Sequence, residues 1–214
     1  MSQVNLTILA ALLGCVSTIG GVIIGALVAF LLEEYRYSRK NRLSNVKLVL
    51  DWSRSGNNSS LRKIDLQGSI LKNIDLSGNE LNSGADLSYA NLRNVDFSYA
   101  SLKNANLSYS DLSGSNFLKA DLTNVDLSHA KGKNANFAGA ILEGANFTYA
   151  EFISSTFHQA VVIRTLFIRA VMLRCNFKDA NFEQANLYEA DLRGSTISKD
   201  QIDKCDTSEK SKLK

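Results

Sequence analysis

A large apolar residue recurs at every fifth position between residues 87 and 197. Of these 23 centres, ten are leucine, nine are phenylalanine, three are other apolar residues, and Gly132 interrupts the series. The residue two positions before the centre is alanine in 15 of the 23 cases. An α-helix repeats near 3.6 residues and a β-strand at 2, so neither explains a period of five. A short repeat used many times indicates a solenoid.

The spacing also predicts the shape of one coil. If each unit forms one straight side and one corner, the centre and the small residue point inward from the same strand face. The Asn or Asp between them points outward and favours a tight turn by hydrogen bonding to its own backbone. Five phenylalanines recur at every fourth unit, so four sides per coil place them in one column. They are Phe97, Phe117, Phe137, Phe157 and Phe177.

Two irregularities accompany the series. An earlier run of centres, Leu61 to Leu81, is one residue out of register, which predicts one inserted residue near Gly84, as in a bulge. Gly132 lacks a core side chain, which predicts a dent or a bulge. The 28 units together predict about seven coils, and a stacking distance of about 4.8 Å gives a rod roughly 33 Å long.

The units have a recognisable sequence. Stretches such as "ADLSY", "ANLRN", "ANFEQ" and "ADLRG" resemble the A(D/N)LXX motif of the pentapeptide-repeat family, over residues 59–198. The resemblance implies an all-β solenoid, a right-handed quadrilateral parallel β-helix. It also implies that residues 199–214 supply a short helix that closes the rod, followed by a polar tail. Ser198 and Gln201 fit a capping box for this helix. A membrane-anchored protein with these repeats resembles anchored members of the family from cyanobacteria and other bacteria.

The N-terminal segment carries no charged side chain from Met1 to Leu32. The apolar run from Leu6 to Leu32 would form a helix about 40 Å long, which exceeds the roughly 30 Å hydrocarbon core of a bilayer. We therefore expect residues 1–32 to form a single transmembrane helix. The alternative is a cleavable signal peptide, but that would need a basic segment before a shorter apolar run.

Basic residues follow the apolar run and none precedes it, which predicts an outer N-terminus and a cytoplasmic repeat domain. Residues 33–58 are expected to form a basic juxtamembrane helix and a linker. Ser17, Gly21 and Gly25 are spaced by four and form a stripe of small residues, which would let two membrane helices pack closely as a homodimer. Glycine is also common in membrane helices, so the stripe has a second explanation.

The sequence contains no recognisable catalytic or metal-binding motif. Three widely spaced cysteines and two histidines predict neither a disulfide framework nor a zinc site. We expect no enzyme activity and no cofactor. Some pentapeptide-repeat proteins resemble the DNA duplex and bind type II topoisomerases, but such mimicry needs an acidic rod. Residues 59–197 contain 14 acidic and 13 basic side chains, so we expect neither DNA mimicry nor a nucleic-acid partner. The leading hypothesis is a membrane-anchored interaction or scaffolding module for an unidentified protein partner.

One segment departs from the outward polar pattern. On three successive sides between residues 160 and 177, aliphatic residues replace the outward polar ones, and an arginine follows each pair. We call these residues the 161–174 patch: Val161, Ile163, Arg164, Leu166, Ile168, Arg169, Val171, Leu173 and Arg174. Exposed apolar surface is typical of an interface, and the arginines are expected to bind carboxylates of a partner. A distorted coil or a covering loop is the alternative.

A second surface feature is a column of aromatic residues two positions after the centres of successive coils. We call it the aromatic ladder: Tyr89, Tyr109, His129 and Tyr149. Stacking of the rings on one another and contact with a partner are both compatible with this arrangement.

Overall fold

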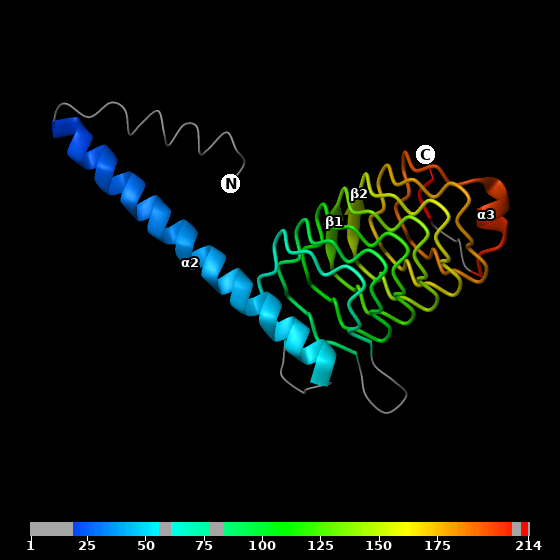
Figure 1. Cartoon of the computed structure of the whole chain (residues 1–214). Coiled ribbons are helices and arrows are strands. Elements are labelled where there is room, and N and C mark those ends of the chain that lie inside the picture. Colours follow the sequence, from blue (N-terminus) through cyan, green and yellow to red (C-terminus); the bar gives the residue numbers. More distant parts are fainter. Residues whose placement is uncertain (1–18, 56–60, 78–83, 207–210, 214) are drawn as a thin grey trace. The chain divides into compact units, whose positions relative to one another are not determined.

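The computed structural model describes residues 19–55, 61–77, 84–206 and 211–213. It divides into two compact units, Met1–Ser44 and Asn45–Lys214. The elements in chain order are helix α2 (Ile19–Ser55), strands β1 (Lys131–Lys133) and β2 (Glu151–Ile153), and helix α3 (Lys199–Asp203) (Figure 1).

The second unit is a stack of four-sided coils (Figure 1). Equivalent positions of successive coils pair in parallel, for example Asp121 with Ile141 and Asp126 with Asn146. The N–H of Leu122 donates to the Ile141 carbonyl at 2.7 Å, and the Ile141 N–H donates to the Ala120 carbonyl at 3.0 Å. These alternating bonds join each coil to the next. The predicted four-sided parallel solenoid is therefore confirmed.

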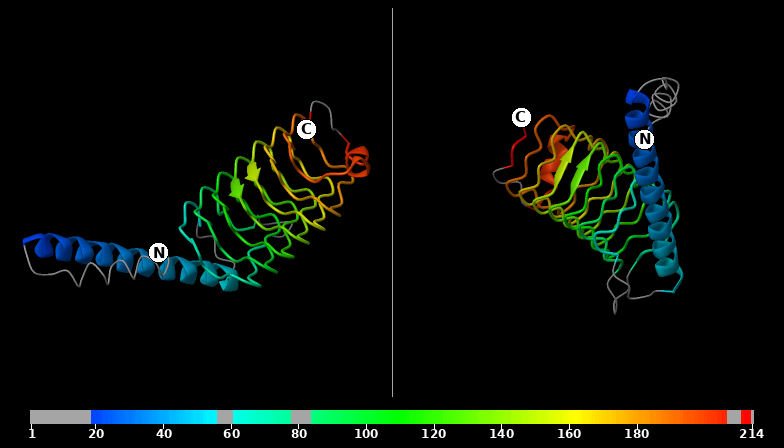
Figure 2. Two further views of the ribbon diagram at one scale, coloured as in Figure 1. Left: turned by 90° about the horizontal axis from the view of Figure 1, so that it is seen from above. Right: turned by 90° about the vertical axis from the view of Figure 1, so that its left-hand side faces the viewer.

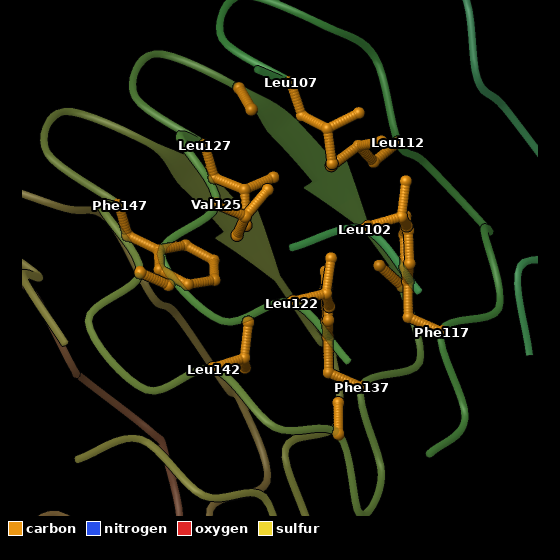
Figure 3. Packing of buried hydrophobic residues seen from close by; sticks show 14 of the residues in the cluster. Leu102, Leu107, Leu112, Phe117, Leu122, Val125, Leu127, Phe137, Leu142 and Phe147 are labelled. Carbon is orange, nitrogen blue, oxygen red and sulfur yellow. The ribbon is translucent and has the colours of Figure 1, made fainter. Parts of the chain in front are cut away.

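The interior consists of columns of centres. Figure 3 shows one column with Leu102, Leu122 and Leu142, and another in which Phe117 lies beside Phe137. The predicted phenylalanine column is confirmed: its ring centroids are 5.4, 4.8, 4.9 and 4.9 Å apart from Phe97 to Phe177, and all five side chains are buried. Nearly all of the small residues two positions before the centres are buried too, as predicted.

Each corner is a turn with a left-handed residue. The residue two positions after the centre has a positive φ, such as 60° at Tyr89 and 57° at Asn104. The Asn or Asp before the centre accepts a hydrogen bond from the backbone two residues later. The Ser98 N–H, for example, donates to Asp96 Oδ1 at 3.0 Å. The predicted turn role of Asn and Asp is confirmed.

The insertion near Gly84 is longer than predicted. Asp75 pairs with Ser101, whereas Asp86 pairs with Asn106 at the regular spacing of one coil. The first pairing spans six more positions of the chain than the second, so the insertion has a length of six, and the prediction of one was wrong. Because the Ala85 N–H donates to the Leu76 carbonyl at 3.0 Å, Leu87 is the next centre after Leu76. A longer insertion at a corner adds little to the free-energy cost of closing the loop. Leu81 itself lies outside the described residues.

Gly84 and Gly132 have a different role from the one predicted. A Cβ on Gly84 would lie 2.6 Å from the Lys103 carbonyl oxygen, so glycine permits close backbone contact there. Gly132 lies in β1, which pairs in register with β2 without a bulge. The two short strands lie side by side in Figure 2. A Cβ on Gly132 would lie 2.0 Å from the Phe152 ring. Phe152 fills the space, so the prediction of a dent or bulge was wrong.

Helical residues cover both ends of the rod. At the first coil, Val49 of α2 is buried, Trp52 packs against the core, and Asn45 Nδ2 donates to the Asp65 carbonyl at 2.9 Å. At the last coil, the capping box of α3 is confirmed, since Gln201 N–H donates to Ser198 Oγ and Gln201 Oε1 accepts from the Ser198 N–H. The apolar core is therefore closed by segments of the same chain.

Helix α2 runs without a break from Ile19, which lies within the apolar segment, through the basic residues. Over the described residues, no helix has a stretch that is both long enough and apolar enough to cross a membrane. Of the expected span, residues 1–18, including Ser17, lie outside the described part. Gly21 and Gly25 lie in α2. The membrane anchor and its packing stripe stay predictions.

Candidate protein-interaction surfaces

The 161–174 patch lies on three faces of the rod at one level. Val161, Leu166 and Val171 belong to three different columns. Their column neighbours are Ile141 and Asn181, Asn146 and Asn186, and Glu151 and Asp191, in that order. The Leu166 side chain is 37% exposed, and the other aliphatic members are half-buried. The patch is therefore a belt around three sides and not one flat surface.

The belt interrupts one polar column whose side chains otherwise bind from coil to coil. In the column of Leu166, Asn146 Nδ2 donates to Asp126 Oδ1 at 3.2 Å; the similar bond from Asn136 Nδ2 to Asn116 Oδ1 at 2.9 Å lies in the fourth column, which holds no belt residue. Leu166 follows Asn146 in its column and has no amide that could continue this series. Leu166 thus replaces a side chain of the kind that links the coils earlier in its column.

Two of the three arginines in the patch already bind carboxylates of this chain. Arg164 forms an ion pair with Glu143. Arg169 Nε donates to Glu189 Oε2 at 2.7 Å, and Arg169 also donates to the Tyr149 hydroxyl at 2.6 Å. The hydrogen bond to Tyr149 and then that to Glu189 raise the pKa of Arg169.

Arg174 is the arginine of the patch that remains available to a partner. It is exposed, and over the described part of the chain it forms no ion pair. We expected all three arginines to bind a partner's carboxylates, and this expectation now applies to Arg174 alone.

Ile141 belongs to the same surface but did not stand out in the sequence. It is 40% exposed and pairs with Val161 one coil later. The available signal was the same as for Val161, an aliphatic residue at the outward Asn/Asp position. Ile141 stands alone in its own coil, so only the column from coil to coil places it beside the patch.

The aromatic ladder is a continuous stack. Its ring centroids are 4.8, 4.6 and 5.2 Å apart, and successive rings are within 14° of parallel. Arg62 lies over the Tyr89 ring at 5.3 Å and Arg169 over the Tyr149 ring at 5.7 Å. Stacking within the chain is confirmed. The ring faces are covered, so only edges and hydroxyls face a partner, and contact with a partner stays a prediction.

The described residues show no arrangement with evident chemistry. Over the ranges that the structure describes, no three His, Cys, Asp or Glu side chains lie close enough to hold a metal. Cys175 is buried, and this burial raises the pKa of its thiol to about 12, so the unreactive thiol form predominates. The predictions of no enzyme activity and no cofactor remain untested by these observations.

Charges of both signs are paired across the rod surface. Arg93 lies 2.9 Å from Asp111 and Lys103 lies 3.0 Å from Asp121. Burial opposes ionisation of Asp121, but hydrogen bonds from Thr123 and Lys103 outweigh it and hold the pKa of its carboxyl below the usual value. Such surface pairs contribute little stability, but in each pair a cation lies beside an acidic side chain.

Comparison with known proteins identifies the family. A family model of pentapeptide repeats matches eight copies, in residues 59–98, 83–108, 100–131, 133–162 and 163–198. This chain is a pentapeptide-repeat protein. The four-sided parallel coil described above is the predicted quadrilateral β-helix. No curated protein sequence matches the chain.

Solved structures with similarity to the chain include three pentapeptide-repeat proteins. QnrB1, a plasmid-mediated fluoroquinolone resistance protein, is 22% identical over 71% of this chain and 76% of its own, with a TM-score of 0.33. A protein of the Arabidopsis thaliana thylakoid lumen is 24% identical over 69% and 80%, with a TM-score of 0.35. Rfr23 of the cyanobacterium Cyanothece is 15% identical over 70% and 91%, also with a TM-score of 0.35. At these values the likeness says nothing about activity or partners.

Proposed function

We propose that this pentapeptide-repeat protein is a non-catalytic interaction or scaffolding module that a single N-terminal span holds at the cytoplasmic face of a membrane. The 161–174 patch, together with Ile141, binds a protein partner. The observation that carries this proposal is the replacement of outward polar residues by aliphatic ones on three successive faces.

The fold does not require aliphatic residues at these outward positions. The inward centres and small residues already form a buried core, and outward Asn residues elsewhere link the coils. Leu166 and Ile141 are instead 37% and 40% exposed. Exposed apolar groups that lie close together are typical of binding surfaces, and Arg174 offers a partner a charged hydrogen-bond donor.

The anchor is supported by the sequence flanking the apolar run. No charged residue occurs from Met1 to Leu32, and cations follow from Arg36 onward. A cation-rich flank stays on the cytoplasmic side. The rod lies after this flank, so it would be cytoplasmic, and a homodimer through Ser17, Gly21 and Gly25 would bring two rods together.

Fractionation and protease protection test the anchor and its orientation. The protein should stay in the membrane fraction after alkaline extraction, and protease added to intact cells should leave the rod uncut. Release by alkali would contradict the anchor. Cleavage of the rod from outside would contradict the orientation alone.

Site-specific photo-crosslinking tests the partner surface. A photoreactive residue at position 166 in the native cell should give one discrete adduct. Asn106 lies in the same column three coils earlier and provides a matched control position. Equal adducts from both positions, or none from position 166, would contradict the proposed surface.

DNA mimicry is the alternative function, and the charges of the rod do not favour it. Its acidic side chains are nearly balanced by basic ones, and several acidic side chains are paired. The purified protein should therefore leave DNA gyrase active. Inhibition of supercoiling would reverse the order of the two proposals.

A further inference from the structure

Helix α2 contains a stretch of unbalanced positive charge. It follows the acidic pair Glu33 and Glu34 and has, between Tyr35 and Leu50, five cationic side chains and no acidic one: Arg36, Arg39, Lys40, Arg42 and Lys47. Arg36, Arg39 and Lys40 are exposed, and within the described residues none of them forms an ion pair. Many cations of the rod have such partners: Arg62, Arg93, Lys103, Arg164, Arg169, Arg193 and Lys204.

The position of these cations limits which anion they can meet. Lys40 follows Leu32, the last residue of the apolar run, by two turns of helix, which is about 12 Å along the axis. Side chains on a helix lean toward its N-terminus, so the long Arg and Lys side chains extend back toward the apolar run. Their charged ends would therefore lie near the headgroups of a membrane that the run spans.

Two tyrosines of helix α2 lie next to these cations. Tyr35 is half-buried and Tyr37 is 69% exposed, and the two flank Arg36. Tyrosine is enriched where a membrane meets water, because its ring is apolar and its hydroxyl is polar. An exposed tyrosine beside unpaired cations at the end of an apolar run is typical of a headgroup contact.

We propose that Arg36, Arg39 and Lys40 bind anionic phospholipid headgroups, so that acidic lipids gather around the anchor. This inference rests on the proposed membrane anchor. Electrostatic attraction is screened over about 8 Å at physiological ionic strength. The three residues nearest the apolar run therefore account for most of the effect, and Lys47 contributes little.

Energy transfer from Trp52, the one tryptophan of the chain, tests the proposal with full-length protein. The protein is placed in phosphatidylcholine vesicles with a trace of acceptor-labelled phosphatidylglycerol or acceptor-labelled phosphatidylcholine. Transfer to the anionic lipid should exceed transfer to the neutral one about fivefold, the factor expected from one cation near an anionic surface. High salt should remove the difference.

A matched pair of variants locates the effect. Arg36→Gln with Arg39→Gln and Lys40→Gln should bring the ratio close to one. The control changes three exposed rod lysines by the same charge, as Lys131→Gln, Lys133→Gln and Lys178→Gln, and should keep the ratio of the unmodified protein. All six positions are exposed, so circular dichroism should show both variants folded.

The outcomes separate the lipid inference from the anchor. Equal transfer to both lipids from protein that floats with the vesicles overturns the lipid inference and leaves the anchor in place. Selectivity that survives the helix variant overturns the assignment to these three residues. Failure of the unmodified protein to float with either vesicle overturns the anchor, and the lipid inference with it.

Discussion

Substitution of Gly132 by leucine, the residue that the repeat favours at this position, should destabilise the rod. A Cβ at Gly132 would lie 2.0, 2.2 and 2.8 Å from three atoms of the Phe152 ring. The ring has little freedom to move, because it packs edge-on against Phe137 at 5.6 Å and Phe147 at 5.4 Å, and all three are buried. Overpacking of such a core costs about 1–3 kcal/mol, and a whole leucine at these distances belongs at the upper end.

A double-mutant cycle separates this clash from other effects. Phe152→Leu alone should cost about 1–2 kcal/mol because it leaves a cavity. Gly132→Leu combined with Phe152→Leu should recover at least about 1 kcal/mol relative to the sum of the single changes, since leucine then stacks on leucine as at Leu102 and Leu122. Urea unfolding followed by circular dichroism measures all four proteins. A neutral Gly132→Leu, or additive effects in the double variant, would refute the reasoning.

Three further predictions concern the core, the cap and acid stability. Phe137→Ala should lower the free energy of unfolding by about 3–5 kcal/mol, since Phe137 is stacked on both sides; a loss below about 1 kcal/mol in urea unfolding would mean that the column is not buried. Gln201→Leu removes the donor to the Phe177 and Ala180 carbonyls and should cost about 1–3 kcal/mol, whereas Asp200→Asn serves as a near-neutral control in the same assay. The hydrogen bond from Arg193 lowers the pKa of Asp191 in the folded chain, so its stabilisation is present above about pH 4 and is lost as the pH falls through the lowered value; Asp191→Asn should flatten the acid side of the stability profile, and an unchanged profile would exclude Asp191 as a contributor.

The coil could be predicted from the sequence because its inward positions obey a strict rule. Nearly every side supplies one large apolar residue and one small residue. Equivalent residues form columns only if the coil contains a whole number of five-residue units. The spacing of the phenylalanines then fixed four sides. The same rule did not give the length of the insertion near Gly84, because a register shift of one position is equally compatible with one or with six inserted residues.

The side-chain packing around Gly132 also could not be predicted from the five-residue period. The series shows that Gly132 lacks a side chain, but not which neighbour fills the space. That depends on the ring direction of Phe152, which is set by packing against several other rings. The five-residue period identifies which positions point inward. The packing of the side chains determines how large and small ones fill the interior of the rod.

The candidate surface was partly visible in the sequence. Aliphatic residues at outward positions could be identified directly. The partners of the arginines were missed, although Tyr149 and Glu189 lie one coil before and one coil after Arg169. These partners can be found in the sequence by comparing outward residues that are 20 positions apart, since such residues lie in one column. Val161 and Val171 are half-buried. The extent of this burial depends on side-chain packing and could not be predicted from the sequence.

The most direct test of the proposed function compares partner capture by the unmodified protein and by a variant with Val161→Asn, Leu166→Asn and Val171→Asn. Asparagine suits all three columns, whereas aspartate at position 171 would face Glu151 and Asp191. The variant should unfold within a few degrees of the unmodified protein, because a surface change of this kind costs about 1 kcal/mol or less. Its capture of the partner by chemical crosslinking in the native cell, which needs no photoreactive residue at position 166, should fall at least tenfold. Undiminished capture by the folded variant, or a rod that no longer folds, would contradict the assignment of these residues to a partner surface.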